Sequence, residues 1–193
     1  MLKNHLRPAL VLTLVLMVIT GLLYPGAVTA VAGLFFPRQA DGSLVRVDGH
    51  VVGSLLIGQT FASARYFHGR PSAAGAGYDD TLSGGTNLGP TSARLDTLIV
   101  RAVDSAATLD HWEKGEIPTD LVTSSGSGLD PDISPASAAG QVARIARERG
   151  LPEAVVRALV ARCTARRFLG LLGEPRVNVL MLNLALDSLG RTR

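Results

Sequence analysis

The chain has 193 residues, of which 47% are apolar and only 5% aromatic, and its formal net charge is +3. Residues 38–193 are enough for one domain with a hydrophobic core, which must be built mainly from Leu, Val, Ile and Ala. The single cysteine, Cys163, excludes an internal disulfide and a cysteine-rich zinc site, and its helical spacing from Val156 and Leu159 predicts a core residue.

An uncharged apolar stretch occupies the chain from Pro8 to Pro37. It is about 30 residues long, whereas an α-helix needs about 20 to cross the hydrocarbon layer of a membrane. Lys3 and Arg7 precede the stretch, and because basic residues favour the cytoplasmic side, the amino terminus is predicted to be cytoplasmic. The expected organisation is a cytoplasmic tail (1–7), one transmembrane helix (8–36), a linker (37–53) and a single extracytoplasmic domain (54–193).

A cleaved export signal is the alternative interpretation, because small residues near Ala27, Ala30 and Ala32 suit a signal peptidase. The apolar core of an export signal is usually about 7–15 residues long, so the observed length favours a retained anchor. Small side chains within an anchor also allow neighbouring helices to approach closely. The predicted contacts with partner helices are Gly21, Gly26, Ala27, Ala30 and Gly33.

The rest of the chain predicts an α+β domain with a small sheet and several short helices. Short apolar or β-branched runs indicate extended segments. These are Leu55–Ile57, Asp120–Thr123 and Arg176–Val179, with a further strand or two in the Gly-rich region 41–53. Two segments dense in Gly, Ser, Asp and Pro, residues 66–90 and 124–135, are predicted loops, and long loops in a compact domain are usually functional.

Apolar residues at helical spacing predict four helices in this domain. Ser134 suits the start of the second helix and Gly150 suits its end. The four helices are expected to run from about Thr91 to Ala106, from Pro135 to Gly150, from Pro152 to Cys163 and from Leu180 to Leu189.

Arginines gather in the carboxy-terminal third of the chain. A groove for single-stranded nucleic acid pairs basic residues with stacking aromatics, and only Phe168 lies nearby in the sequence. No nucleic-acid partner is therefore predicted, and the arginines are expected on solvated helix faces, with Arg144 and Ser137 opposite the apolar face. The set is Arg144, Arg147, Arg149, Arg157, Arg162, Arg166 and Arg167.

No spacing typical of catalysis is visible. The four histidines are not paired on one helix face, so no metal site is predicted. Ser127 lies between glycines without the spacing of a nucleophile elbow, and turns explain Asp130 and Asp132 better than a calcium site does. The chain is predicted not to be an enzyme. The alternative is a membrane-anchored extracytoplasmic binding module or hydrolase that uses the loop 124–132.

One segment has features of a phosphate-binding loop, because adjacent glycines can present backbone N–H groups to an anion. It consists of Leu82, Ser83, Gly84, Gly85 and Thr86. It is similar to the Leu-Ser-Gly-Gly-Gln signature of ABC-type ATPases, with threonine in place of glutamine. No Gly-Lys-Ser/Thr loop is present, so the chain has no nucleotide-hydrolysing loop of that kind. These five residues are the predicted nucleotide contact, and a turn-rich loop is the alternative.

Several segments, taken in order along the chain, form a distinctive set. The segments are Leu22–Pro25, Gly53–Gln59, Tyr66–Phe67, Arg70–Ala73, Ser83–Pro90, Asp120–Thr123, Ser125–Pro131, Ile133–Pro135, Gly173–Leu180 and Leu182–Leu184. Together they resemble one known family, the C subunit of the bacterial Kdp potassium-transporting ATPase. The resemblance covers nearly the whole chain, and the ordered set is specific although each piece alone is not.

The resemblance implies an accessory, non-catalytic subunit of a high-affinity, ATP-driven potassium pump in the bacterial inner membrane. The implied partners are a P-type ATPase subunit, a channel-like potassium-binding subunit and a very small peptide subunit. It also implies a catalytic chaperone, which raises the ATP affinity of the ATPase subunit through the signature-like segment. No tightly bound cofactor is implied, and ATP is expected only through the complex.

The predicted orientation conflicts with a direct nucleotide site, because the charge bias places the domain outside the cytoplasm and ATP is inside. An external domain would instead brace the pump or cover the potassium entrance. Acidic side chains would then raise the local cation concentration, within the screening length of about 8 Å at physiological salt. The acids considered for this role are Asp79, Asp80, Asp130 and Asp132.

Overall fold

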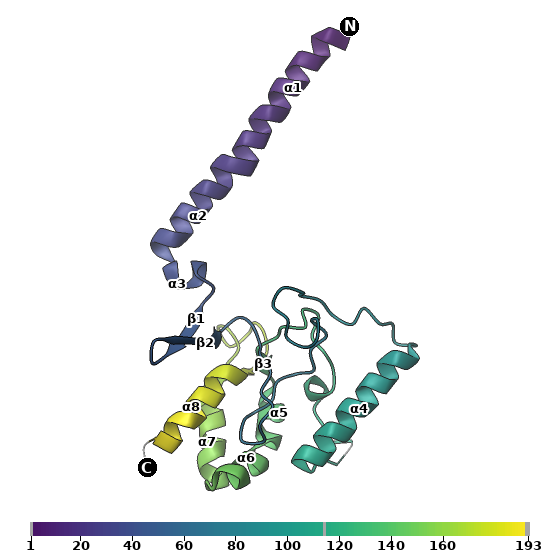
Figure 1. The fold of residues 1–193 in the computed structure, drawn as a ribbon, viewed down its shortest axis with the longest axis vertical. Coiled ribbons are helices and arrows are strands. Elements are labelled where there is room, and N and C mark those ends of the chain that lie inside the picture. Colours follow the sequence, from purple (N-terminus) through teal and green to yellow (C-terminus); the bar gives the residue numbers. More distant parts are fainter. Residues whose placement is uncertain (1, 114, 192–193) are drawn as a thin grey trace. The chain divides into compact units, whose positions relative to one another are not determined.

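The computed structural model describes residues 2–113 and 115–191 of the chain, so the ends of the predicted tail and domain, Met1 and residues 192–193, lie outside the described residues. The chain divides into two compact units, Met1–Val52 and Gly53–Arg193. Its elements are helices and two small sheets, which confirms the predicted mixture of α and β structure (Figure 1).

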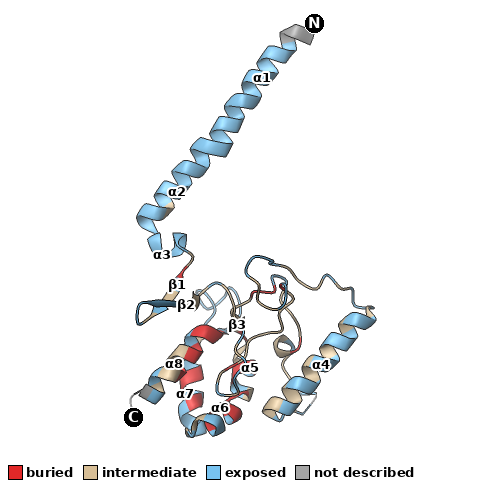
Figure 2. Ribbon diagram, in the orientation of Figure 1, coloured by how far each residue is buried: buried red, intermediate tan, exposed pale blue. Residues whose placement is uncertain are grey.

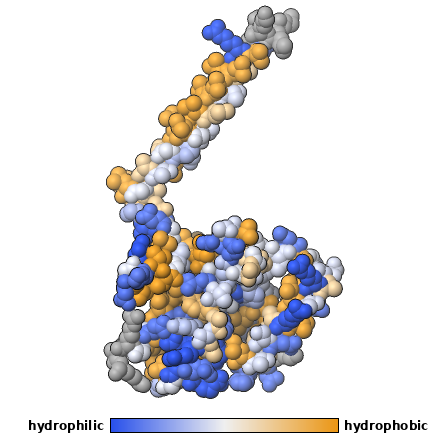
Figure 3. Space-filling model, in the orientation of Figure 1, coloured by the Kyte–Doolittle hydropathy of each residue, from blue (hydrophilic) through white to orange (hydrophobic). Residues whose placement is uncertain are grey.

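The first unit begins with a helix long and apolar enough to span a membrane. It comprises α1 (Leu2–Val18), a π-helical turn η1 (Ile19–Leu23) and α2 (Tyr24–Phe35). Its 31-residue apolar part, His5–Phe35, has a mean hydropathy of 2.2 and is not buried within the protein. Figure 3 shows strongly apolar side chains along the upper part of this helix and a paler stretch below, before apolar residues return at its lower end. A helix with apolar side chains all round is stable when lipid or other helices cover its surface.

The π-helical turn has an identifiable cause in the sequence. Pro25 has no N–H, and its ring clashes with the carbonyl group one turn earlier. The helix widens just before it, where the N–H of Tyr24 donates to the carbonyl oxygen of Ile19, five residues back. The Thr20 hydroxyl is also satisfied inside the helix, because it donates to the Leu16 carbonyl oxygen at 2.7 Å.

A short helix and a hairpin complete the first unit. After α3 (Pro37–Ala40), β1 (Leu44–Val47) and β2 (His50–Ser54) pair as a two-stranded sheet. Asp48 and Gly49 join them with φ values of 51° and 82°, as a type I′ hairpin turn requires. The expectation of a strand or two in this Gly-rich region is confirmed.

The second unit is built on a three-stranded antiparallel sheet in the order β3-β5-β4. Its strands are β3 (Asp132–Ile133), β4 (Thr164–Ala165) and β5 (Arg176–Asn178). Val177 in the central strand faces Ile133 on one side and Thr164 on the other. The extended segment predicted after Gly173 is therefore confirmed.

Five helices and one 3-10 turn accompany this sheet. The cap at Ser134 is confirmed, because its hydroxyl accepts the N–H of Ser137, and Gly150 ends α6 with a φ of 63°. The predicted second helix is divided at Gln141 into two helices. The elements are α4 (Ala93–Asp110), η2 (Thr119–Leu121), α5 (Pro135–Gly140), α6 (Val142–Arg149), α7 (Glu153–Cys163) and α8 (Val179–Arg191).

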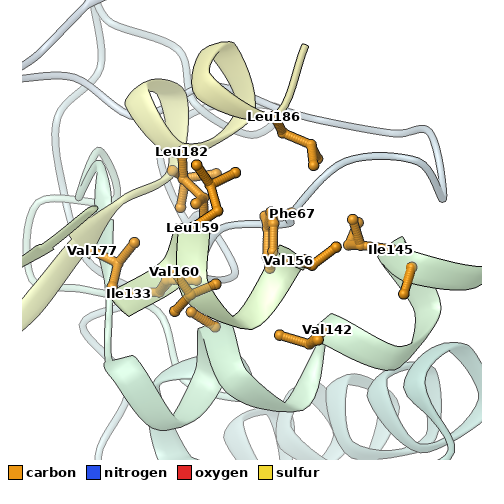
Figure 4. Packing of buried hydrophobic residues seen from close by; sticks show 13 residues of the cluster. Phe67, Ile133, Val142, Ile145, Val156, Leu159, Val160, Val177, Leu182 and Leu186 are labelled. Carbon is orange, nitrogen blue, oxygen red and sulfur yellow. The ribbon is translucent and has the colours of Figure 1, made fainter. Parts of the chain in front are cut away.

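The hydrophobic core lies between α5, α6, α7, α8 and the sheet (Figure 4). Phe67 is its one fully buried aromatic residue in the described chain, and Cys163 packs at its edge as predicted. Helix α4 is different, because it has no buried residue, as the absence of red in Figure 2 shows. Trp112, just after α4, packs against Gly140 at the end of α5, where any larger side chain would displace the indole.

Two predicted strands are wrong. Residues 55–57 form a bend, because the Leu56 N–H donates to the Ser54 hydroxyl, and Leu56 is exposed. Residues 119–121 form the 3-10 turn η2 in place of a strand. Asp120 there accepts the N–H of Ser134 at 2.7 Å and the hydroxyl of Ser137 at 2.6 Å, so this segment caps α5.

The prediction that Arg144 and Ser137 face solvent is also wrong, since both are buried. Arg144 lies inside the second unit and donates to the Asp110 carboxylate at 2.6 Å and to the Tyr66 carbonyl oxygen at 2.8 Å. It also donates to the carbonyl oxygen of Ala64. The guanidinium is buried because the irregular segment 64–66 has backbone acceptors that no helix or strand satisfies.

Side-chain amides bind the next two residues of the same irregular segment. The Asn183 amide accepts the Phe67 N–H at 2.8 Å and donates to the Phe67 carbonyl oxygen at 3.0 Å. The Gln141 amide does the same for His68, at 2.8 and 3.2 Å. Each amide makes the pair of hydrogen bonds that a neighbouring β-strand would make with one residue. These bonds explain how an irregular segment is held in the core.

We expect His68 to make the stability of the domain depend on pH. Burial lowers the pKa of its imidazole below the ordinary value of 6.5; the Ser63 carbonyl opposes this shift, Arg144 adds to it and Asp110 opposes it. Since the folded state disfavours the charged form, the contribution is complete above pH of about 6.5 and is lost as the pH falls. The free energy of unfolding, measured with denaturant at several pH values, should fall less steeply with decreasing pH for His68→Asn than for the native chain. An identical dependence of this free energy on pH below about 6.5 would contradict this assignment.

Candidate functional site

The two long loops of the second unit interlock through their backbones. The Gly84 N–H donates to the Ser127 carbonyl oxygen at 2.8 Å, and the Ser83 hydroxyl reaches the same oxygen at 3.2 Å. The Ser72 hydroxyl donates to the Gly128 carbonyl oxygen at 2.6 Å and accepts the Tyr78 N–H at 2.7 Å. The loops 66–90 and 124–135 therefore form one structure, although neither contains a regular element until β3.

Glycine is required where these loops cross. Gly128 has a φ of +68°, and a Cβ atom there would lie 2.6 Å from the Gly84 carbonyl oxygen. A Cβ atom at Gly85 would lie 3.2 Å from the Gly126 carbonyl oxygen. Close approach of the two backbones thus explains the glycines at positions 85 and 128.

A cleft opens between these loops and α4, and we call it the loop–α4 cleft. Its volume is about 450 Å³, within the range of about 300–1,000 Å³ typical of small-molecule sites. Apolar residues of α4 line one side, residues of the two loops and of the segment 122–124 line the other, and Arg94 is the one charged residue among those that line it. The lining residues are Pro71, Ser72, Ala73, Gly75, Gly85, Thr86, Leu88, Arg94, Leu95, Leu98, Ile99, Val122, Thr123 and Ser124.

An ion pair ties the two loops together near the cleft. Arg70 donates to the Asp130 carboxylate at 2.9 Å and to the Thr123 carbonyl oxygen at 3.4 Å. Tyr78 donates its hydroxyl to the Arg70 carbonyl oxygen at 2.7 Å. Burial, followed by the Asp130 charge, raises the pKa of Tyr78, while Arg70 opposes the shift. The phenol is therefore a neutral hydrogen-bond donor at physiological pH.

The acids considered for cation attraction lie in different environments. Asp130 is paired with Arg70, and Asp132 is paired with Arg176 at 2.9 Å. Burial raises the pKa of Asp132, and the Asn178 hydrogen bond and the Arg176 charge oppose that shift. Asp79 accepts the hydroxyl and the N–H of Thr81, which lower its pKa. Arginines thus offset two of the four negative charges.

The predicted nucleotide contact divides between the cleft and the loop crossing. Gly85 and Thr86 line the cleft, whereas Leu82 is exposed and Ser83 bonds to the other loop. The Gly84 N–H is already used by Ser127. The backbone donors that a phosphate would need are therefore partly occupied by the fold itself.

Ser127 is part of the loop structure. Its hydroxyl accepts the Leu129 N–H at 3.1 Å and lies 3.3 Å from the Ser125 hydroxyl. Within the described residues, no hydrogen bond joins Ser127 to a histidine. These contacts explain the serine by turn geometry.

The small residues of the anchor lie on α2 and η1, where their surroundings are open. Gly26, Ala30 and Gly33 follow one another at helical spacing on α2, and a side chain at either glycine would meet no atom of this chain. Ala27 lies beside this face, and Gly21 lies in the π-helical turn. The face is therefore available for another helix.

Sequence reasoning missed the open apolar face of α4 as part of a site. The sequence placed Leu95, Leu98 and Ile99 on one apolar face of a predicted helix; they line the cleft, and Leu98 is more than one third exposed. The available signal was the pair of long glycine-rich loops that flank this helix, because such loops leave little apolar surface to cover it.

Comparison with known proteins gives a single family. A model described as the K+-transporting ATPase, c chain, matches residues 6–188. A potassium-transporting ATPase KdpC subunit of Gemmatimonas aurantiaca is 63% identical over 190 residues, covering 98% of this chain and 95% of that protein. The corresponding subunit of Sorangium cellulosum is 59% identical over 184 residues, covering 95% of this chain and 97% of the relative. That of Caulobacter vibrioides is 57% identical over 187 residues, covering 96% of this chain and 93% of the relative.

Proposed function

Because the chain belongs to the family of the K+-transporting ATPase c chain, we propose that it is a non-catalytic, single-pass accessory subunit of an ATP-driven potassium pump. The observation that carries the proposal is the 31-residue apolar helix, which is unburied and precedes a separate compact unit. Such a chain needs a bilayer, and it presents a folded domain at one side of it. The proposed location is the bacterial inner membrane, with the amino terminus in the cytoplasm and the domain outside.

The proposed partners are a P-type ATPase subunit, a channel-like potassium-binding subunit and a small peptide subunit. The test is to tag the carboxy terminus, extract membranes of potassium-starved cells with mild detergent, and identify the co-purifying proteins. Recovery of an ATPase subunit with a channel-like partner is expected. Recovery of a stable, monomeric chain alone would overturn the proposal and favour an anchored binding module.

The anchor is proposed to pack against a partner helix through its small residues. Replacing Gly26 by isoleucine should reduce the partner recovered by about tenfold, because about 1.4 kcal/mol of lost packing has that effect. Val28→Ile is the matched control, since residue 28 lies on the opposite side of α2 and the change adds only one methylene group. Equal recovery for both variants, measured by quantitative co-purification, would place the interface elsewhere.

The external domain is proposed to brace the pump near the potassium entrance. Arg70 and Arg176 offset the charges of Asp130 and Asp132, so any attraction of cations would depend mainly on Asp79 and Asp80. Neutralising these last two should raise the potassium concentration needed for half-maximal transport while assembly stays intact. An unchanged potassium affinity would remove the entrance role.

A nucleotide contact is a second candidate, in which the chain acts as a catalytic chaperone that raises ATP affinity. One observation favours it, namely that Gly85 and Thr86 line a cleft of about 450 Å³ together with Arg94. Photoreactive ATP applied to either side of sealed vesicles containing the whole complex would test it. Labelling of the cleft that is lost in Arg94→Gln would support the contact, and labelling only of the ATPase subunit would remove it.

A further inference from the structure

The hairpin that joins β4 to β5 ends in an exposed apolar tip. The tip comprises Phe168, Leu169, Gly170, Leu171 and Leu172, which we call the apolar tip. Leu169 is 79% exposed and Leu171 is 81% exposed, more than any other large apolar side chain in the second unit. Phe168 and Leu172 are also more than half exposed. An apolar cluster of this kind on a soluble surface indicates a docking site.

Backbone hydrogen bonds close the tip into a defined turn. Phe168 and Leu172 exchange two backbone hydrogen bonds, at 2.8 and 3.0 Å, and the Leu171 N–H donates to the Phe168 carbonyl oxygen at 3.1 Å. Leu169 and Gly170 have φ values of 52° and 76°, which is the geometry of a type I′ turn. The tip is therefore a hydrogen-bonded turn with exposed apolar side chains.

Leucine is an unfavourable residue at the first central position of this turn. A positive φ suits Asn, Asp or Gly there and is uncommon for a large aliphatic side chain. Leu169 gains no burial within the domain to offset this strain. Leu169 thus has both an unfavourable backbone conformation and an apolar side chain in water. This combination is expected for a side chain that has its partner outside the domain.

Arginines flank the apolar tip in the sequence. Residues 162–176 contain four arginines and one acid, Glu174, and one of these arginines, Arg176, pairs with Asp132 at 2.9 Å. Glu174 is paired with Arg167 at 2.6 Å, while Arg166 is exposed and forms no ion pair with any described residue. An apolar projection with an arginine base matches the interface of an anionic membrane, where leucine and phenylalanine enter the acyl boundary and arginines meet the headgroups.

The membrane surface is also within reach. The apolar helix ends at Phe35, and the spacer of about 17 residues before Gly53 extends at most about 60 Å. The spacer therefore tethers the domain to the bilayer that would contain its anchor, and such a tether raises the effective concentration of that surface. We propose that the apolar tip inserts into the anionic surface of this membrane and gives the domain a second attachment point. The proposal rests on the proposed anchor and goes beyond it.

The test uses the full chain in lipid vesicles with a fluorescent probe. Cys163 is first changed to serine, and an environment-sensitive dye is attached at Leu171→Cys or, as the control, at Val100→Cys, an exposed apolar position on α4. With anionic phospholipids brominated in their acyl chains, we expect a blue shift and loss of emission at residue 171 but not at residue 100. The loss should diminish when the brominated lipids are neutral.

A second variant separates docking from folding. Leu169→Asn suits the type I′ turn, so the stability of the chain should be equal or higher, while the quenching at residue 171 should fall.

Vesicle flotation separates failure of the anchor from failure of the tip. A chain that does not float with the vesicles overturns both proposals. A chain that floats but is quenched equally at residues 171 and 100 overturns the tip alone. A blue shift without quenching that requires the pump subunits would assign the tip to a protein partner, and equal quenching in neutral lipid would overturn the choice of an anionic surface.

Discussion

Replacing Arg144 by methionine is expected to lower the free energy of unfolding by about 3–5 kcal/mol, the usual cost of removing one partner of a buried ion pair. The Arg144 side chain is 1% exposed and its partner Asp110 is 5% exposed. The substitution would leave the Asp110 carboxylate buried without its cation, and the carbonyl groups of Ala64 and Tyr66 without their donor. Methionine fills a similar volume, so the loss reports the charge and the hydrogen bonds more than a cavity.

Urea unfolding of the full chain in detergent measures this effect, with Trp112 as the single tryptophan reporter. Arg147→Met is the control, because that residue lies on the same helix, is mostly exposed and pairs only with its neighbour Glu148; a change within about 0.5 kcal/mol is expected. The double variant Arg144→Met, Asp110→Leu should recover part of the loss, since no buried charge then remains alone. Equal stability of the two single arginine variants would contradict the buried network.

Phe67→Ala is expected to cost about 3–5 kcal/mol, as removal of a buried aromatic ring usually does. Phe67 is 0% exposed and lies within the cluster formed by α6, α7 and α8 (Figure 4). Its ring is contributed by an irregular segment, so the loss of its packing would also release the backbone that Asn183 holds. The same urea unfolding experiment measures the change.

Phe168→Ala is the matched control for this prediction, because the chemical change is the same and Phe168 is 68% exposed. Its effect on the isolated chain should stay within about 0.5 kcal/mol. If the two phenylalanine variants were equally stable, Phe67 would not be the residue that fixes the irregular segment to the core.

The helices were predictable because local rules agree with the packing. The Ser134 hydroxyl caps the start of α5, Gly150 ends α6 with a left-handed backbone conformation, and the apolar spacing of α7 and α8 matches the faces that are buried. Arg144 was not predictable, because its charge placed it on the solvent side of a continuous helix. What buries it is a set of acceptors far away in the sequence, which no local pattern contains.

The candidate site was only partly predictable for a similar reason. The glycine-rich composition correctly indicated two loops with a special geometry, but not that they bond to each other through Gly84 and Ser127. Asp120 looked like the start of a strand, and its carboxylate instead caps α5. Backbone and side-chain contacts across 14 to 44 residues decided these cases, and such contacts depend on the complete fold.

The two hydrogen bonds between the Asn183 amide and the Phe67 backbone join residues 116 positions apart. Contacts of such sequence separation form late, since a long loop must close before they contribute. As synthesis proceeds from the amino terminus, the apolar helix and the segment around Phe67 exist well before α8 does. Phe67 therefore cannot be enclosed until the last helix has been made, so the core of the second unit closes only near the end of synthesis.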